Sequence, residues 1–72
     1  SDRYDRIFFA VRTLEGEQVG GDPDLPAFVL PIGEQRYYAD AAMRGEPVRV
    51  AVARLPTAAG DLQFLVAETR VK

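Results

Sequence analysis

Apolar and polar side chains alternate along much of the chain with a period of two residues. In residues 6–13, Ile7 and Phe9 lie on one side of an extended backbone, and Phe8 and Ala10 lie on the other. This period is typical of β-strands, and the aromatic and β-branched side chains of the segment favour a strand over a helix. We therefore expect a first strand at residues 6–13.

The same reasoning predicts one short strand and three further main strands. They are expected at residues 18–20, 36–43, 48–55 and 62–70. The alanines of residues 36–43 would also suit a helix, but Gly45 and Pro47 leave room for only about two helical turns. A strand is therefore the favoured interpretation of that segment.

Glycine and proline mark the connections between these strands. Gly16 can supply the positive φ of a tight hairpin turn after the first strand. Residues 21–26 and 56–61 are predicted loops, and Pro31 restricts the apolar residues 27–32 to a short edge element at most. The predicted fold is mainly β: an antiparallel sheet of four to five strands in meander order, because short connections favour neighbouring pairs.

Apolar side chains also occur on the second face of these strands. They are Phe8, Ala10, Ala51, Ala53, Leu55, Leu65 and Ala67. A sheet that is apolar on both sides must be covered on both. Three explanations remain open: a covering helix upstream of Ser1 that is missing here, a second copy of the chain, or an alanine-rich face that water tolerates.

Composition fits one small globular domain, residues 1–72, with 47% apolar residues and a net charge of −2. The charge balance argues against nucleic acid as a partner, which would require a clustered basic face. The chain has no cysteine and no histidine, so we expect no thiolate metal site and no cofactor. Because it begins without methionine, we expect a fragment excised from a longer protein.

Four motifs in order along the chain resemble one known family. The first two are residues 5–12, DRIFFAVR, and residues 21–26, GDPDLP. The later ones are YADA at 38–41 with RGEPVRVA at 44–51, and VAET at 66–69. Together they resemble the N-terminal input domain of two-component sensor histidine kinases of the tricarboxylate-transport and quorum-sensing type.

The resemblance implies a PAS-like extracytoplasmic sensor that lies on the periplasmic face of the bacterial inner membrane, between two transmembrane helices. In such proteins a helix precedes the first strand and packs on the central sheet. The kinase parts are absent from this chain, which we therefore expect to be non-catalytic. Residues 27–36 depart from the family pattern, so no ligand residues are carried over.

If the ligand is a small carboxylate, arginine is the expected binding residue, because its planar guanidinium can bind a carboxylate through two hydrogen bonds. The candidates are Arg12, Arg49 and Arg54, with Tyr37 or Tyr38 as hydroxyl donors. Arg49 and Arg54 are predicted to lie on opposite faces of one strand, so they cannot share a pocket unless a bulge intervenes. The competing interpretation is that these arginines are solvated or form surface ion pairs.

Two other kinds of site are disfavoured. Asp22 and Asp24 provide too few oxygens for a calcium site, so they are interpreted as turn residues that bond to their own backbone. Nothing in the sequence selects a carboxylate pair such as Asp40 and Glu46 for acid–base catalysis.

The sequence thus leads to two functional hypotheses. The first is signal input by a homodimeric sensor domain that passes a ligand-induced shift to flanking transmembrane helices. The alternative is a dimerisation or protein-binding module of the cell envelope that has no small-molecule ligand.

Overall fold

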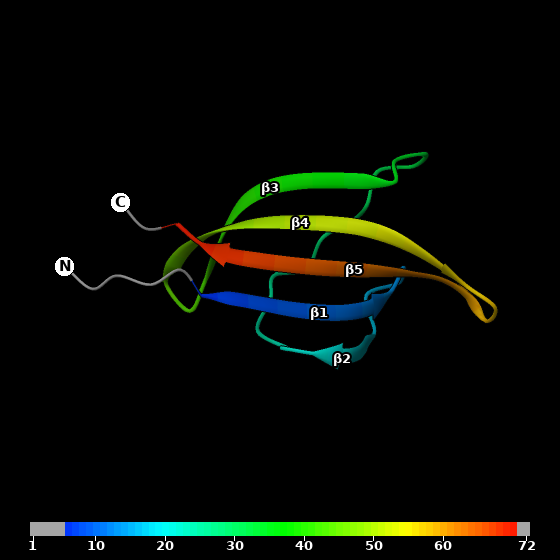
Figure 1. The fold of residues 1–72 in the computed structure, drawn as a ribbon, viewed down its shortest axis with the longest axis horizontal. Coiled ribbons are helices and arrows are strands. Elements are labelled where there is room, and N and C mark those ends of the chain that lie inside the picture. The colour runs from blue at the N-terminus through cyan, green and yellow to red at the C-terminus, as the bar shows by residue number, and fades with distance from the viewer. Residues whose placement is uncertain (1–5, 71–72) are drawn as a thin grey trace.

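Five antiparallel strands form one open sheet in the computed structural model, which describes residues 6–70 (Figure 1). The strands are β1 (Ile7–Thr13), β2 (Gln18–Gly21), β3 (Arg36–Met43), β4 (Glu46–Thr57) and β5 (Gly60–Thr69). The predicted mainly-β fold is confirmed, as is the strand assignment of residues 36–43. Between residues 6 and 70 there is no helix that is long and apolar enough to cross a membrane.

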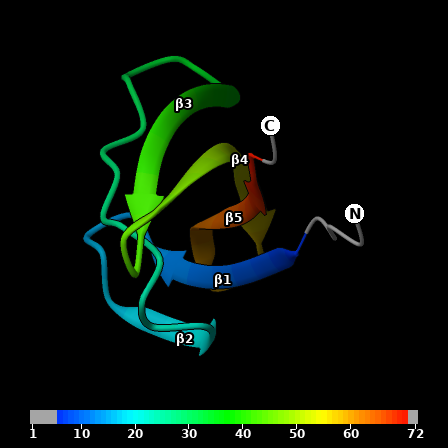
Figure 2. The ribbon, with the colours of Figure 1, turned by 90° about the vertical axis from the view of Figure 1, so that its left-hand side faces the viewer.

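The strand order is β2-β1-β5-β4-β3, which differs from the predicted meander. The hairpins β1–β2, β3–β4 and β4–β5 pair sequential strands, as a meander would. A meander would also pair β2 with β3, but here β1 pairs with β5, so β2 and β3 lie at opposite edges of the sheet. The segment between β2 and β3 must therefore cross the sheet from one edge to the other. Figure 2 shows the sheet curving around this crossing segment, residues 22–35.

The β4–β5 hairpin is longer than predicted, because the expected loop at residues 56–61 shrinks to the two residues Ala58 and Ala59. Pro56 pairs with Asp61 inside the ladder. Arg54 N donates to Gln35 O (2.9 Å), so alternate residues of β4, including residue 56, direct their backbone groups toward the β3 side. The β3 ladder does not extend that far, so the missing N–H of Pro56 removes no hydrogen bond.

The hydrophobic core lies between the crossing segment and one face of the sheet. The buried members are Ala10, Leu25, Met43, Val48, Val50, Val52, Leu65 and Ala67, and Phe28 and Leu30 pack against them. The alternation within each strand is as predicted, but the pairing between strands combines their faces differently from the prediction. Ala10 and Leu65, opposite each other, belong to the covered face, whereas Ala51 and Ala53 lie on the other.

A buried arginine holds the crossing segment against the sheet. Arg12 is only 6% exposed and donates from Nη2 to Leu25 O (2.7 Å) and from Nη1 to Pro26 O (2.8 Å). Its Nε donates to Gln18 Oε1 at 2.9 Å. The crossing segment has no strand to satisfy its backbone, and the bonds from Arg12 supply donors to two of its carbonyl groups. A buried carbonyl group without a donor would cost free energy, because water cannot replace the missing bond.

Candidate functional site

The second face of the sheet carries large apolar side chains that no described residue covers. Ile7 is 67% exposed, Phe9 53% and Tyr38 56%, although all three lie in regular strands. Phe9 and Phe64 meet across β1 and β5 with ring centroids 6.3 Å apart. Contiguous exposed apolar surface of this kind marks interaction sites in soluble proteins. We refer to this surface as the open face.

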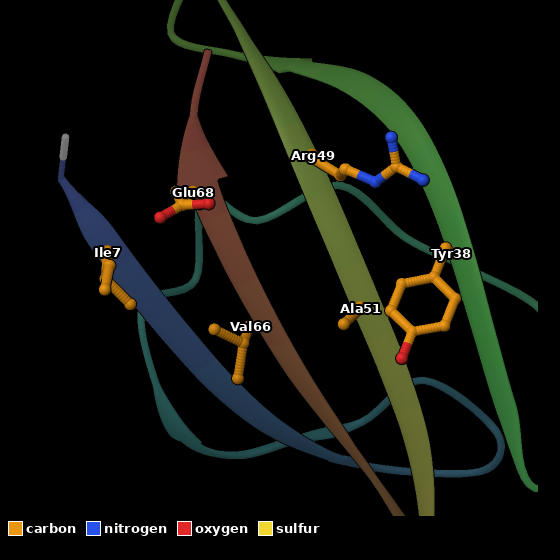
Figure 3. A pocket seen from close by; sticks show the side chains of 6 residues that line it. All are labelled: Ile7, Tyr38, Arg49, Ala51, Val66 and Glu68. Atoms are coloured by element: carbon orange, nitrogen blue, oxygen red, sulfur yellow. The ribbon is translucent and has the colours of Figure 1, made fainter. Parts of the chain in front are cut away.

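A shallow hollow of about 250 Å³ lies on the open face near the end of the sheet where β1 begins and β5 ends. Figure 3 shows the six side chains around it: Ile7, Tyr38, Arg49, Ala51, Val66 and Glu68. The register explains the depression. Ala51 stands between Tyr38 on β3 and Val66 on β5 in one cross-strand row, and its single methyl group leaves space between two larger neighbours.

Two opposite charges lie beside this apolar floor. Arg49 and Glu68 are register partners on β4 and β5, yet among residues 6–70 neither has an ion-pair partner within 4 Å. In Figure 3 the guanidinium of Arg49 extends toward β3, on the side of Tyr38, while the carboxylate of Glu68 stays near β5. The register partner of Arg49 on β3 is Asp40, whose carboxylate binds Arg70 Nη1 at 2.9 Å, so within residues 6–70 the guanidinium keeps its donors for another anionic group.

Only two of the five predicted binding residues, Tyr38 and Arg49, line this hollow. Arg12 is buried on the covered face, where its donors bond to Gln18, Leu25 and Pro26, and Tyr37 also points to that side.

Arg54 lies on the covered side as well, and its Nη1 is 3.2 Å from Asp61 Oδ2. The prediction that Arg49 and Arg54 occupy opposite faces of one strand is confirmed, since they are an odd number of positions apart in β4 and the ladder between them has no bulge.

The sequence interpretation missed the contribution of Glu68 and of the apolar floor. Their position depends on which residue of β5 lies opposite each residue of β4. That register follows from the two-residue turn at Ala58 and Ala59. The sequence predicts a longer loop there, at residues 56–61. A two-residue turn pairs Thr57 with Gly60, and counting back along both strands from that pair places Glu68 opposite Arg49.

A second polar cluster joins the crossing segment to the β3–β4 turn. Arg44 Nη2 lies 2.9 Å from Asp22 Oδ2, Arg44 Nε lies 2.7 Å from Asp24 Oδ2, and the guanidinium lies over the Phe8 ring at 5.6 Å. Asp24 N donates to Asp22 Oδ1 at 2.9 Å, which confirms the predicted turn role for Asp22, whereas within residues 6–70 the carboxylate of Asp24 bonds to Arg44 and to no backbone group of the turn. That backbone bond, with the bonds from Arg44, lowers the pKa of Asp22.

The contacts of the cluster indicate a structural role, since they hold the crossing segment to the β3–β4 turn. One arginine, Arg44, forms ion pairs with both carboxylates, and its own pKa is raised by the same bonds. Within residues 6–70 no group of three or more acidic side chains is placed to hold a metal ion.

Comparison with known proteins yields one match. A family model described as "Two-component sensor kinase N-terminal" matches residues 1–72. Neither a curated protein nor a solved structure matches the chain.

Proposed function

Because the chain belongs to the family of two-component sensor kinase N-terminal domains, we propose that it is the signal-input domain of a membrane-bound sensor histidine kinase and that it faces the periplasm. Signal input requires two states of the domain that a stimulus can bias by binding one better than the other. The open face provides a surface on which a stimulus could act, because its apolar side chains are uncovered by residues 6–70.

The proposed stimulus is a small carboxylate bound in the hollow of the open face. The observation that supports this is the guanidinium of Arg49, which borders the hollow on the side of Tyr38 and has no ion-pair partner within residues 6–70. A guanidinium binds a carboxylate through two parallel hydrogen bonds, and the Tyr38 hydroxyl, which points away from the guanidinium in Figure 3, can donate to a second carboxylate group of the same ligand. Ala51 and Val66 would contact the apolar part of such a ligand.

We expect titration with di- and tricarboxylates such as citrate to produce a saturable rise in melting temperature, since a ligand that binds only the folded state stabilises it by mass action. Arg49→Gln should weaken binding at least about tenfold, which corresponds to about 1.4 kcal/mol. Isothermal titration calorimetry on both proteins measures this difference.

Arg54→Gln is the matched control, because it removes an arginine from the same strand but from the opposite face. Equal loss of binding in both variants, or no binding of any carboxylate to the unaltered chain, would argue against the hollow as a carboxylate site.

The exposed apolar residues favour a second candidate, a dimerisation or protein-binding module without a small-molecule ligand. Ile7, Phe9 and Leu55 are each at least 45% exposed on the open face. A module of this kind should gain thermal stability with protein concentration and show no response to carboxylates.

We also propose that the domain is PAS-like, with a helix of the parent protein laid on the open face. Small residues on β4, Ala51 and Ala53, support this because they leave room for a helix to approach the sheet closely. A helix in that position would close the hollow over a bound ligand.

A further inference from the structure

The outer edge of β3 is a free strand edge. β3 pairs with β4 over eight residues in an uninterrupted register and contains no proline, glycine or lysine. Arg54 N donates to Gln35 O, so the odd-numbered residues of β3 bond to β4, and Arg36, Tyr38, Asp40 and Ala42 direct their backbone groups outward. Between residues 6 and 70, no segment other than β4 makes a backbone hydrogen bond with this strand.

The opposite edge of the sheet is poorly suited to pairing. β2 has four residues, two of them glycine, and the β1–β2 register shifts between Val11 and Arg12. Its Gly20 carbonyl already accepts a hydrogen bond from Gln18 Nε2 at 2.6 Å. Short, irregular strands of this kind blunt a sheet edge against further pairing. A long, regular edge on one side only is suited to a closed pair of copies rather than an open fibre.

We propose that β3 pairs antiparallel with β3 of a second copy of this chain, with Tyr38 opposite Tyr38 and Arg36 opposite Asp40. Residues with outward backbone groups must face each other in such a ladder, which leaves only registers that differ by steps of two residues. In the proposed register each copy places its arginine against the carboxylate of the other, twice about the twofold axis. Opposite charges and aromatic pairs at directly facing positions stabilise antiparallel ladders.

The charges of the single chain are consistent with this register. Arg36 is exposed and has no ion pair among the described residues. Asp40 binds Arg70 Nη1 through Oδ1 at 2.9 Å, but its side chain is still 73% exposed. On the covered side of the strand Tyr37 would face Ala39, so a large side chain meets a small one.

The neighbouring registers are less favourable. Shifting the pairing toward the end of β3 places Tyr38 opposite Asp40 and Arg36 opposite Ala42, which gains ladder length but leaves both charges without a facing partner. A further shift brings Asp40 opposite Asp40, and like charges at facing positions are destabilising.

The proposed pair would join the two open faces into one. Tyr38 lines the hollow of its own copy, so the two hollows would lie on either side of the twofold axis. This inference does not require that a carboxylate binds, and its test contains no ligand.

Sedimentation equilibrium of the 72-residue chain tests the charge pairing. The unaltered chain should show a reversible monomer–dimer equilibrium, and Asp40→Arg should raise its dissociation constant at least about tenfold, since arginine would then face arginine. Adding Arg36→Asp to that variant should restore dimerisation. The double variant still lacks the carboxylate that binds Arg70, so restoration cannot come from that ion pair.

Two results of this experiment would overturn the proposal. One is a strictly monomeric unaltered chain up to millimolar concentration. The other is a double variant that dimerises as weakly as Asp40→Arg alone while its circular dichroism shows a folded sheet.

Single cysteines test the register, because the chain has no cysteine of its own. Directly facing residues of a hydrogen-bonded pair have Cα atoms about 5.5 Å apart, within the range that a disulfide spans. Tyr38→Cys should therefore form a disulfide-linked dimer under mild oxidation much faster than Ala39→Cys or than Ala59→Cys in the exposed β4–β5 turn. Faster cross-linking of Ala39→Cys would show the shifted register, and equal rates for Ala59→Cys would show random collision; either result contradicts the proposal.

Discussion

Arg12 illustrates how a residue type typical of ligand binding can have a structural role. Its guanidinium is buried and donates to two carbonyl groups of the crossing segment and to Gln18. Replacing it with leucine would keep the volume roughly but leave those carbonyls without donors. We expect Arg12→Leu to lower the free energy of unfolding by about 3 kcal/mol, measured by urea denaturation.

Arg54→Leu provides the comparison for this change. The Arg54–Asp61 pair is partly exposed, and surface pairs of that kind contribute about 0–1 kcal/mol. Similar losses of stability in the two variants would show that Arg12 does not hold the crossing segment in the way its contacts indicate.

The Asp22–Arg44 contact makes stability depend on acidity. The pKa of Asp22 is lowered from its usual value of 3.8 by the Asp24 backbone bond and by Arg44. A carboxylate with a lowered pKa contributes stability that is complete above about pH 4 and is lost as the pH falls through the lowered pKa. We expect Asp22→Asn to melt at a lower temperature than the unaltered chain near pH 7, and the gap to narrow below about pH 4. A difference in melting temperature between the two proteins that stays the same from about pH 7 to below about pH 4 would contradict this linkage.

At the scale of the elements, the β2 strand ends at a glycine whose position disfavours any side chain. Gly21 has a φ of +85°, and a Cβ there would collide with the backbone of Phe9 and Ala10 on β1. The next residue, Asp22, donates its N–H to Phe9 O at 2.7 Å and starts the crossing segment. The close approach of the two backbones therefore fixes the point where the chain leaves the sheet.

We expect Gly21→Ala to destabilise the domain by more than about 2 kcal/mol, because it adds both backbone strain and a steric clash. Gly20→Ala is the matched control: a Cβ at Gly20 meets nothing within 4 Å, so the change should cost less than about 1 kcal/mol. Chemical denaturation of the two variants compares them directly, and a loss for Gly20→Ala as large as that for Gly21→Ala would contradict this explanation.

The strands were predictable from the sequence because alternation is a local property. Residues 36–43 form the predicted strand with the predicted bounds. The pairing of β1 with β5 was not predictable in this way, because it joins segments at opposite ends of the chain that only the crossing of residues 22–35 brings together. The hollow was missed for the same reason, since its charged pair depends on the register between strands.

At the scale of the whole molecule, the pairing of β1 with β5 closes a long loop of chain. Ile7 is opposite Glu68, so nearly the entire described chain lies between them. Non-local strand pairs form slowly, because the entropy of closing the loop is lost before the contacts form. We expect refolding to take from about milliseconds to seconds, as in other all-β domains of this size.

Stopped-flow dilution from urea can follow this reaction through the fluorescence of the three tyrosines, since there is no tryptophan. Complete refolding within microseconds would mean that the sheet forms through local hairpins alone, with β1 and β5 not required for cooperative folding.

The hydrogen bond from Thr69 N to Arg6 O, at 3.0 Å, has a mechanical meaning. It places the start of β1 and the end of β5 at the same corner of the sheet. A force that separates these two points would load the β1–β5 hydrogen bonds one after another, as in opening a zipper, instead of loading them all at once in shear. The domain would therefore open under a small force between these two points. Because Arg6 and Thr69 are directly hydrogen-bonded, a small displacement of one would also displace the other.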